Sequence, residues 1–192
     1  MIDLGAAATG LTGAWRLARL DRGGMRYFDA TEAGFWRSFQ AAILAVPFYA
    51  ILLLVEPRPP DQALSPDPLR AILIEAIGYV IRVTAFPLAA WYLARGFNCS
   101  GRYIAFVVAY NWANLLQVIV FFPIVVLAAA TDMSADTLAI PGLIFAAAVF
   151  YYEYFIARAA LAVDALPALT FVGTDFLIAI VVGKIQIYMQ LH

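Results

Sequence analysis

Five long apolar stretches alternate with short polar segments along the chain. At a rise of ~1.5 Å per residue, about 20 apolar residues match a hydrocarbon core of ~30 Å. The stretches lack the ten-residue alternation that a membrane β-barrel shows. The pattern therefore predicts an all-α, polytopic integral membrane protein with a bundle of five transmembrane helices, at residues 35–55, 69–94, 103–129, 138–157 and 167–188.

Polar and turn-forming residues set the boundaries of these spans. Thr31 and Glu32 offer a helix start before the first span, and the Glu-Pro-Arg-Pro-Pro run at 56–60 stops it. Residues 95–102 form a turn flanked by arginines. The link between the last two spans is only a few residues long, so we expect these helices to be antiparallel neighbours.

Composition agrees with a protein that has lipid as its solvent. Hydrophobic residues make up 65% of the chain and charged residues 13%, whereas globular domains have about half apolar and a quarter charged residues. The formal net charge of −1 provides no basic field, so no nucleic-acid partner is predicted. Eleven arginines against one lysine, with many alanines, indicate a GC-rich bacterial genome and hence a bacterial inner membrane.

The arginines also predict an orientation. Those near the span ends gather on one side, and the other side has two arginines beside four aspartates. The positive-inside rule then predicts a cytoplasmic amino terminus and a periplasmic carboxyl terminus. The first set is Arg16, Arg19, Arg22, Arg26, Arg37, Arg95, Arg102 and Arg158, and the second is Arg58, Arg70, Asp61, Asp67, Asp132 and Asp136.

Residues 1–34 form a cytoplasmic amino-terminal segment in this prediction. Within it, residues 11–28 mix apolar side chains such as Leu11 and Trp15 with arginines, as in an amphipathic element that lies on the membrane surface. The alternative is an irregular tail that docks beneath the bundle, since Gly23 and Gly24 break a long helix. The segment lacks the apolar core of a signal peptide, so we expect it to be retained.

Ionisable residues inside the spans are the main clue to activity, because such groups are costly in lipid. Arg82 and Asp175 lie ~20 Å below the outer ends of their helices, and Glu153 lies ~22 Å below its own. Asn111, Asn114 and Gln117 follow a spacing of three at about the same depth. These six residues predict one polar layer, in which Arg82 has a carboxylate partner. Glu75 and Lys184, both nearer the outer ends, are a possible second pair.

Two interpretations of this polar layer remain open. It is either a clasp between helices, as Asn, Gln and paired charges form in membrane proteins, or a site for a small solute or ion or a proton relay. The first interpretation makes the protein a scaffold or accessory subunit, and the second a transporter or channel subunit. The partners predicted are the lipid bilayer, further copies of the chain or other membrane proteins.

Catalytic and cofactor motifs are missing. His192 is the single histidine and Cys99 the single cysteine, so the usual nucleophile arrangements and multi-cysteine metal sites are excluded. No HExxH, GxSxG, Walker A or GxGxxG motif occurs. We predict no catalytic residue, cofactor or metal, and an intramembrane enzyme that uses Glu153 and Asp175 ranks third among the functions.

Residues 95–103, Arg-Gly-Phe-Asn-Cys-Ser-Gly-Arg-Tyr, lead into Val-Val-Ala-Tyr-Asn-Trp at 107–112. This turn and helix, with five spans after a polar amino-terminal segment, resemble the five-helix Yip1-type membrane proteins over residues 27–190. The resemblance implies a role in binding other membrane proteins. The acidic Tyr-Gly-Pro motif of the eukaryotic trafficking members is missing, so no Rab-type partner and no functional residue are carried over.

Overall fold

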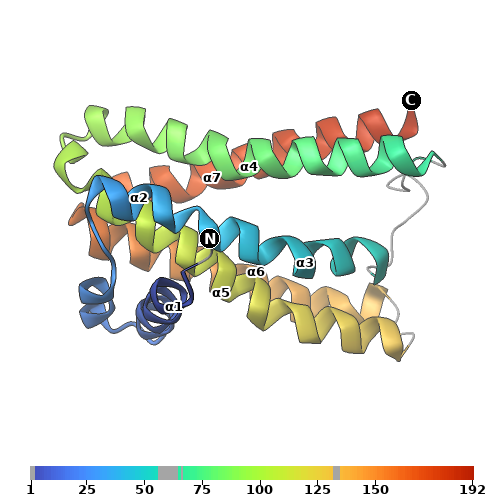
Figure 1. Ribbon diagram of the computed structural model, residues 1–192, viewed down its shortest axis with the longest axis horizontal. Helices are drawn as coiled ribbons and strands as arrows, with labels where there is room; N and C mark the ends of the chain where they lie inside the picture. The colour runs from blue at the N-terminus through green and yellow to red at the C-terminus, as the bar shows by residue number, and fades with distance from the viewer. Residues whose placement is uncertain (1–2, 56–64, 66, 132–134) are drawn as a thin grey trace.

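The computed structural model describes residues 3–55, 65, 67–131 and 135–192, and this part of the chain is all-helical (Figure 1). Arg58, Asp61, Asp132 and the side chain of Asp136, which enter the charge argument, lie outside the described residues. The helices are α1 (Leu4–Ala18), η1 (Arg22–Tyr27), α2 (Glu32–Ser38), α3 (Gln40–Val55), α4 (Pro68–Gly96), η3 (Ser100–Arg102), α5 (Tyr103–Ala130), α6 (Ala135–Leu161) and α7 (Ala165–Leu191).

The five predicted apolar spans are confirmed to within a few residues. Five segments are long and apolar enough to cross a membrane, namely Glu32–Val55, Pro68–Gly96, Ser100–Ala130, Ala139–Leu161 and Ala165–Leu191. Many large apolar side chains on their outer faces are exposed, among them Leu69, Ile72 and Val80. Soluble monomers rarely expose apolar surface on this scale, whereas lipid would cover it.

The long helices form two groups. In Figure 1, α4 and α7 make the upper pair, and α3, α5 and α6 make the lower group. α3 packs mainly on α5 and α4 mainly on α7, while α6 touches both α5 and α7. The antiparallel neighbours predicted for the last two spans are therefore found, joined by a short turn in which Ala162 has φ 52°.

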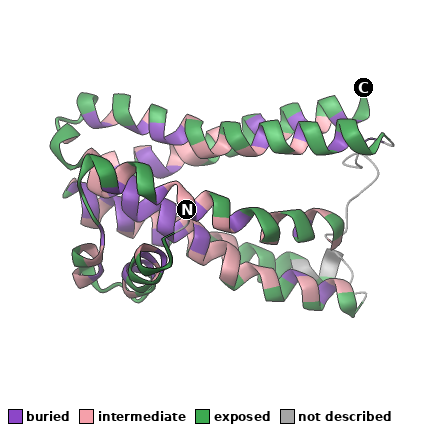
Figure 2. Cartoon of the chain, viewed as in Figure 1, coloured by how far each residue is buried: buried purple, intermediate pink, exposed green. Residues whose placement is uncertain are grey.

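The core lies at one end of the bundle. Buried residues gather where α2 and the α4–α5 turn are found, at the left of Figure 2, and this end also carries Arg37, Arg95, Arg102 and Arg158. We call it the arginine-rich end. The buried residues Phe86, Phe106 and Phe171 bring α4, α5 and α7 together there. At the opposite end, the two groups of helices separate and their side chains are mostly exposed (Figure 2).

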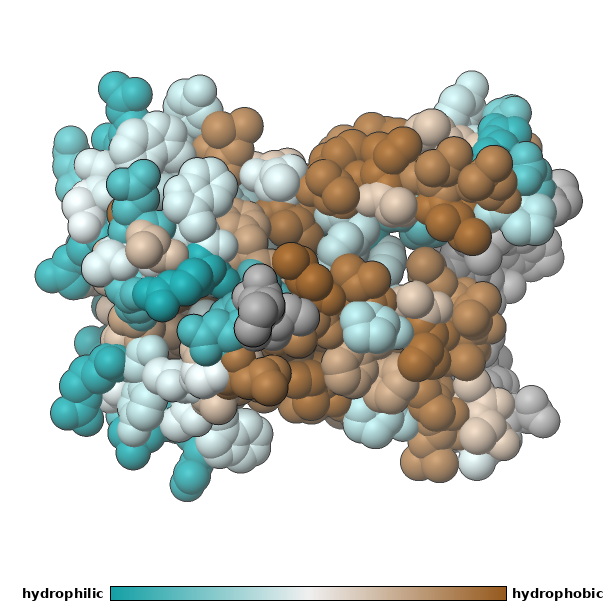
Figure 3. All heavy atoms as spheres, viewed as in Figure 1, coloured by the Kyte–Doolittle hydropathy of each residue, from teal (hydrophilic) through white to brown (hydrophobic). Residues whose placement is uncertain are grey.

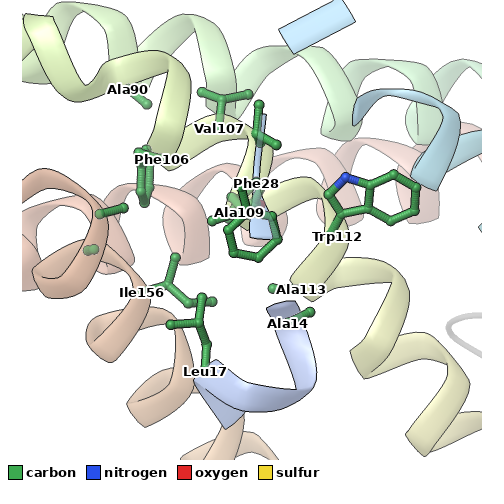
Figure 4. Close-up of a cluster of buried hydrophobic side chains, with 14 of the residues drawn as sticks. Ala14, Leu17, Phe28, Ala90, Phe106, Val107, Ala109, Trp112, Ala113 and Ile156 are labelled. Atoms are coloured by element: carbon green, nitrogen blue, oxygen red, sulfur yellow. The ribbon is translucent and has the colours of Figure 1, made fainter. Parts of the chain in front are cut away.

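The amino-terminal segment is ordered and docked against the bundle. α1 begins at Leu4 because the carboxylate of Asp3 accepts a hydrogen bond from the backbone N–H of Ala6 at 3.0 Å. Small residues let α1 approach α5 and α6 closely, and Ala14 and Leu17 meet Ala113 and Ile156 in the core (Figure 4). The structure thus has the predicted short helix, but it starts seven residues earlier than the predicted 11–28 and continues into η1.

α1 approaches α5 most closely at Gly10, and this contact gives a testable prediction. A Cβ atom on Gly10 would lie 2.3 Å from the Trp112 ring, so Gly10→Val forces α1 away from α5. We expect this overpacking to lower the free energy of unfolding by ~1–3 kcal/mol and to speed tryptic cleavage between α1 and η1. Thermal unfolding and limited proteolysis in detergent measure both effects. Ala8→Val, on the exposed face of the same helix, is the control. Equal behaviour of the two variants would show that α1 is not held in this way.

Candidate functional site

A cavity of about 290 Å³ lies between α3, α4, α5 and α7. It sits where the two groups of helices begin to separate, and Figure 3 shows a hollow at that level between the upper and the lower apolar surfaces. Its walls are mostly apolar, but several polar side chains converge on it inside an apolar bundle, which makes it the candidate functional site. Its polar lining residues are Tyr49, Tyr79, Arg82, Tyr110, Asn111, Asn114, Gln117 and Asp175.

Helical spacing explains why these side chains converge. Asn111, Asn114 and Gln117 recur every three residues along one side of α5, and Arg82 follows Tyr79 by three on α4. Five of the six residues predicted to form the polar layer line this one cavity. The sixth, Glu153, lies behind it, as described below.

Arg82 does not have the predicted carboxylate partner among the described residues. Its Nη2 donates to the hydroxyl of Tyr49, and its guanidinium lies over the same ring at 5.1 Å from the centroid. The ion pairs between described residues are Arg16–Asp21 and Arg37–Asp29, both away from this cavity. Tyr49 of α3 takes the place of the acid because its ring covers the guanidinium. A guanidinium has five N–H donors, and the bond to Tyr49 is the one hydrogen bond that joins Arg82 to a described residue.

Tyr49 extends the polar group from Arg82 toward the opposite end of the bundle. Its hydroxyl accepts from Arg82 and donates to Glu75 Oε2 at 3.3 Å. Arg82 and Glu75 are two helical turns apart on α4, so one phenol on α3 bridges a cation and an acid that do not meet directly.

The predicted pair of Glu75 with Lys184 is wrong. Glu75 instead accepts hydrogen bonds from Gln186 Nε2 at 2.9 Å and Gln190 Nε2 at 3.2 Å, while Lys184 is exposed. Gln186 and Gln190 are four residues apart, so they share the face of α7 that packs on α4, and Lys184 points elsewhere. Both glutamines are almost fully buried, with exposed fractions of 7% and 5%. They form a clasp between α4 and α7 of the kind that amides make in membrane helices.

Asp175 lies on a wall of the cavity, and Glu153 lies behind it. Asp175 Oδ1 accepts from the hydroxyl of Tyr110 at 2.8 Å. Asp175 and Glu153 also line a second hollow of only about 10 Å³, closed by aromatic rings that include Phe86 and Phe171. The two acids therefore come together as their equal depth predicted, and Asp175 is the one that also reaches the main cavity.

Asn111 and Gln117 differ in how their polar groups are satisfied. Asn111 Nδ2 donates to Ser38 Oγ at 2.8 Å, which ties α5 to the end of α2. The Nε2 atom of Gln117 is buried and has no hydrogen-bond partner among the described residues. Asn114 lines the cavity between them. The side chain of Gln117 also lies beside the carboxylate of Glu153, so it connects the cavity wall to the acid behind it.

Four contributors were missed by the sequence-based prediction. Tyr49 looks like a core aromatic in the sequence, and only the fold brings it beside Arg82. Tyr79 carried a usable signal, because it lies three residues before Arg82 on the same helix. Gln186 and Gln190 carried one too, since two amides spaced by four on an apolar helix predict a polar face toward a neighbouring helix.

Comparisons with known proteins identify no relative. No family model, no curated protein and no solved structure matches the chain. The resemblance to the Yip1 type stays a prediction. Among the described residues, no group of three or more His, Cys, Asp or Glu side chains could hold a metal ion.

The clasp between α4 and α7 supports a prediction at Gly78. A Cβ atom there would lie 2.2 Å from the amide carbon of Gln186, so Gly78→Val displaces this amide from Glu75. We expect the free energy of unfolding to fall by ~1–3 kcal/mol, as for other overpacked cores. Gly183→Val on α7 is the control, because no atom lies within 4 Å of its added Cβ. Thermal unfolding of the two variants in the same detergent makes the comparison, and an equal loss in both would rule out the clasp.

Proposed function

We propose that the chain is a multi-pass protein of a bacterial inner membrane that binds and carries a small solute with an anionic group. The observation that carries this proposal is the guanidinium of Arg82, which lines a cavity without an ion pair to any described carboxylate. Burying an unpaired cation among apolar helices is costly, so such groups usually mark a site that a ligand, water or a counter-ion completes.

The chemistry of the walls supports an anionic ligand. Guanidinium groups bind carboxylates and phosphates through paired N–H donors, and Arg82 uses one donor on Tyr49. Asn114 and Gln117 add side-chain amides to the same walls. The volume of about 290 Å³ corresponds to about ten water molecules at ~30 Å³ each. The ligand is therefore a small metabolite or inorganic anion, and Asp175 on the opposite helix accepts from any amino or hydroxyl group that it carries.

A second candidate function, the scaffold or accessory subunit, is favoured by the hydrogen bonds that join the helices. Glu75 with Gln186 and Gln190 connects α4 to α7, and Asn111 with Ser38 connects α5 to α2. These contacts stabilise the bundle whether or not a solute binds. A scaffold needs them but has no use for the cavity around Arg82, which is why we place solute binding first.

We propose no catalytic role for Glu153 and Asp175. The hollow that they share is about 10 Å³, which is space for one water molecule and not for a substrate.

Solute binding is tested by thermal unfolding of the detergent-purified protein with acetate, succinate, inorganic phosphate and alanine. At least one of these should raise the unfolding temperature in a concentration-dependent way, since a ligand that binds only the native state stabilises it. Arg82→Met should abolish this rise. Lys184→Met, which removes an exposed cation on α7, should keep it. A rise that survives in Arg82→Met, or no rise with any of the four compounds, would contradict the proposed site.

Orientation is tested separately. The excess of arginines at the end where α1 docks supports a cytoplasmic amino terminus, and five crossings then put the carboxyl terminus in the periplasm. Alkaline phosphatase fused after His192 should be active, whereas a fusion after Gly96 should be inactive. The opposite result for the two fusions would reverse the orientation.

A further inference from the structure

A second pocket lies directly beneath α1, on the arginine-rich side of the Arg82 cavity. Its volume is also about 290 Å³, and its walls come from α1, η1, α2 and α5. Polar residues line it, among them Asp3, Thr9, Asp29 and Arg37. The solute-binding proposal makes no use of this pocket, although it occupies the route from the Arg82 cavity to the arginine-rich end.

The two pockets are neighbours between α5 and the α2–α3 segment. On the α2–α3 wall, Ser38 lines the pocket beneath α1, and Ala41 and Ala42, about one helical turn or ~5.4 Å further along, line the Arg82 cavity. On α5 the two linings overlap in level, because Asn111 of the cavity comes between Val108 and Trp112 of the pocket. The two spaces therefore lie on different sides of α5 at the level of Asn111.

A single hydrogen bond joins the two walls at this level. Asn111 Nδ2 donates to Ser38 Oγ at 2.8 Å, and Ser38 Oγ donates in turn to the carbonyl of Phe35 at 2.7 Å. The exposed fractions of Ser38 and Asn111 are 1% and 8%. Small residues surround this bond on the α3 side, so opening it would join the two pockets without displacing a bulky side chain there.

The bond lies inside one apolar span. α2 ends at Ser38 and α3 begins at Gln40, and Phe39 between them is itself helical, with φ −67° and ψ −14°. The chain therefore runs on through this level as a helix. Gln40 Oε1, at the first residue of α3, accepts a hydrogen bond from the backbone N–H of Asp3 at 2.9 Å, which ties the span to the start of α1.

Arg37 is not available as a second anion site in the pocket beneath α1. It is paired with Asp29, and hydrogen bonds from the side chain and the backbone of Thr31 lower the pKa of Asp29, with Arg37 acting in the same direction. Asp3 is a further acid on the wall, so the pocket offers no free cation and is a passage, not a second anion site.

We propose that Ser38 and Asn111 form the gate between the Arg82 cavity and the pocket beneath α1. Ser38 lines the pocket, Asn111 lines the cavity, and their hydrogen bond lies between the two spaces. This inference rests on the proposed function, because it gives the bound solute a route to the arginine-rich side. In the conformation described, the bond is formed and the gate is closed.

The test uses a thiol placed in the cavity and needs no solute. Cys99→Ala removes the native thiol, and Val118→Cys puts a new one on the α5 wall of the Arg82 cavity. A membrane-impermeant methanethiosulfonate is applied to right-side-out and to inside-out vesicles. Ser38→Ala should raise the labelling rate from the face that bears α1 by about fivefold, the change that loss of one hydrogen bond produces in an opening equilibrium. The rate from the other face should not change.

Two further variants keep the test decisive. Asn111→Ala removes the other half of the gate and should raise the same rate, whereas Thr170→Ala removes a hydrogen bond within α7, to the carbonyl of Leu166, and should not. If Ser38→Ala and Asn111→Ala both remain folded and label no faster than the parent, the gate does not exist. If they label faster but no anion stabilises the protein through Arg82, the gate stands and the solute-binding proposal fails.

Discussion

The constraint on which this structure depends is the cost of placing a guanidinium among apolar helices. Arg82 is carried at the middle of α4, and no described acid lies within ion-pair distance of it. Tyr49 from α3 compensates for part of this cost. Its hydroxyl accepts one N–H of Arg82 and donates to Glu75, and its ring lies against the guanidinium. The rest of the guanidinium faces open volume. A bundle built only for stability would fill that volume with apolar side chains, since replacing buried charges in this way is often neutral or stabilising.

The two ends of the bundle differ in how the helices pack. At the arginine-rich end, rings from three helices pack together and α1 closes the base. Toward the other end, α4 stays with α7 through Glu75 and its glutamine partners, and α3 stays with α5. Between the two groups, the hydroxyl of Tyr49 on α3 bonds to Glu75 on α4, in place of a shared apolar core. The Arg82 cavity lies between these two ends, with the packed arginine-rich end on one side and the more loosely joined helices on the other.

Sequence reasoning recovered the architecture well because length and apolarity are local properties of each span. It also brought Arg82, Asn114 and Asp175 to one level, since depth along a helix follows from counting residues. It failed where the rotation of one helix against another decides the contact. Lys184 and Gln186 differ by two residues, yet they point to different sides of α7, and only the packing of α4 on α7 selects the glutamine for Glu75.

The same limit explains the position of α1. The amphipathic element was predicted from residue 11, whereas α1 begins at Leu4 in a run of alanines and glycines. The place of this helix depends on how closely its small residues let it approach Trp112. That contact is not encoded locally, because Trp112 is supplied from far along the chain.

The docking of α1 also constrains the order of events during synthesis. α1 rests on Trp112, and the carbonyl of Ala14 accepts a hydrogen bond from the hydroxyl of Tyr152, 138 residues downstream. These partners do not exist until α5 and α6 have been made, so α1 reaches its native contacts long after its own synthesis. Until then its apolar face has no protein surface from these helices to bury it.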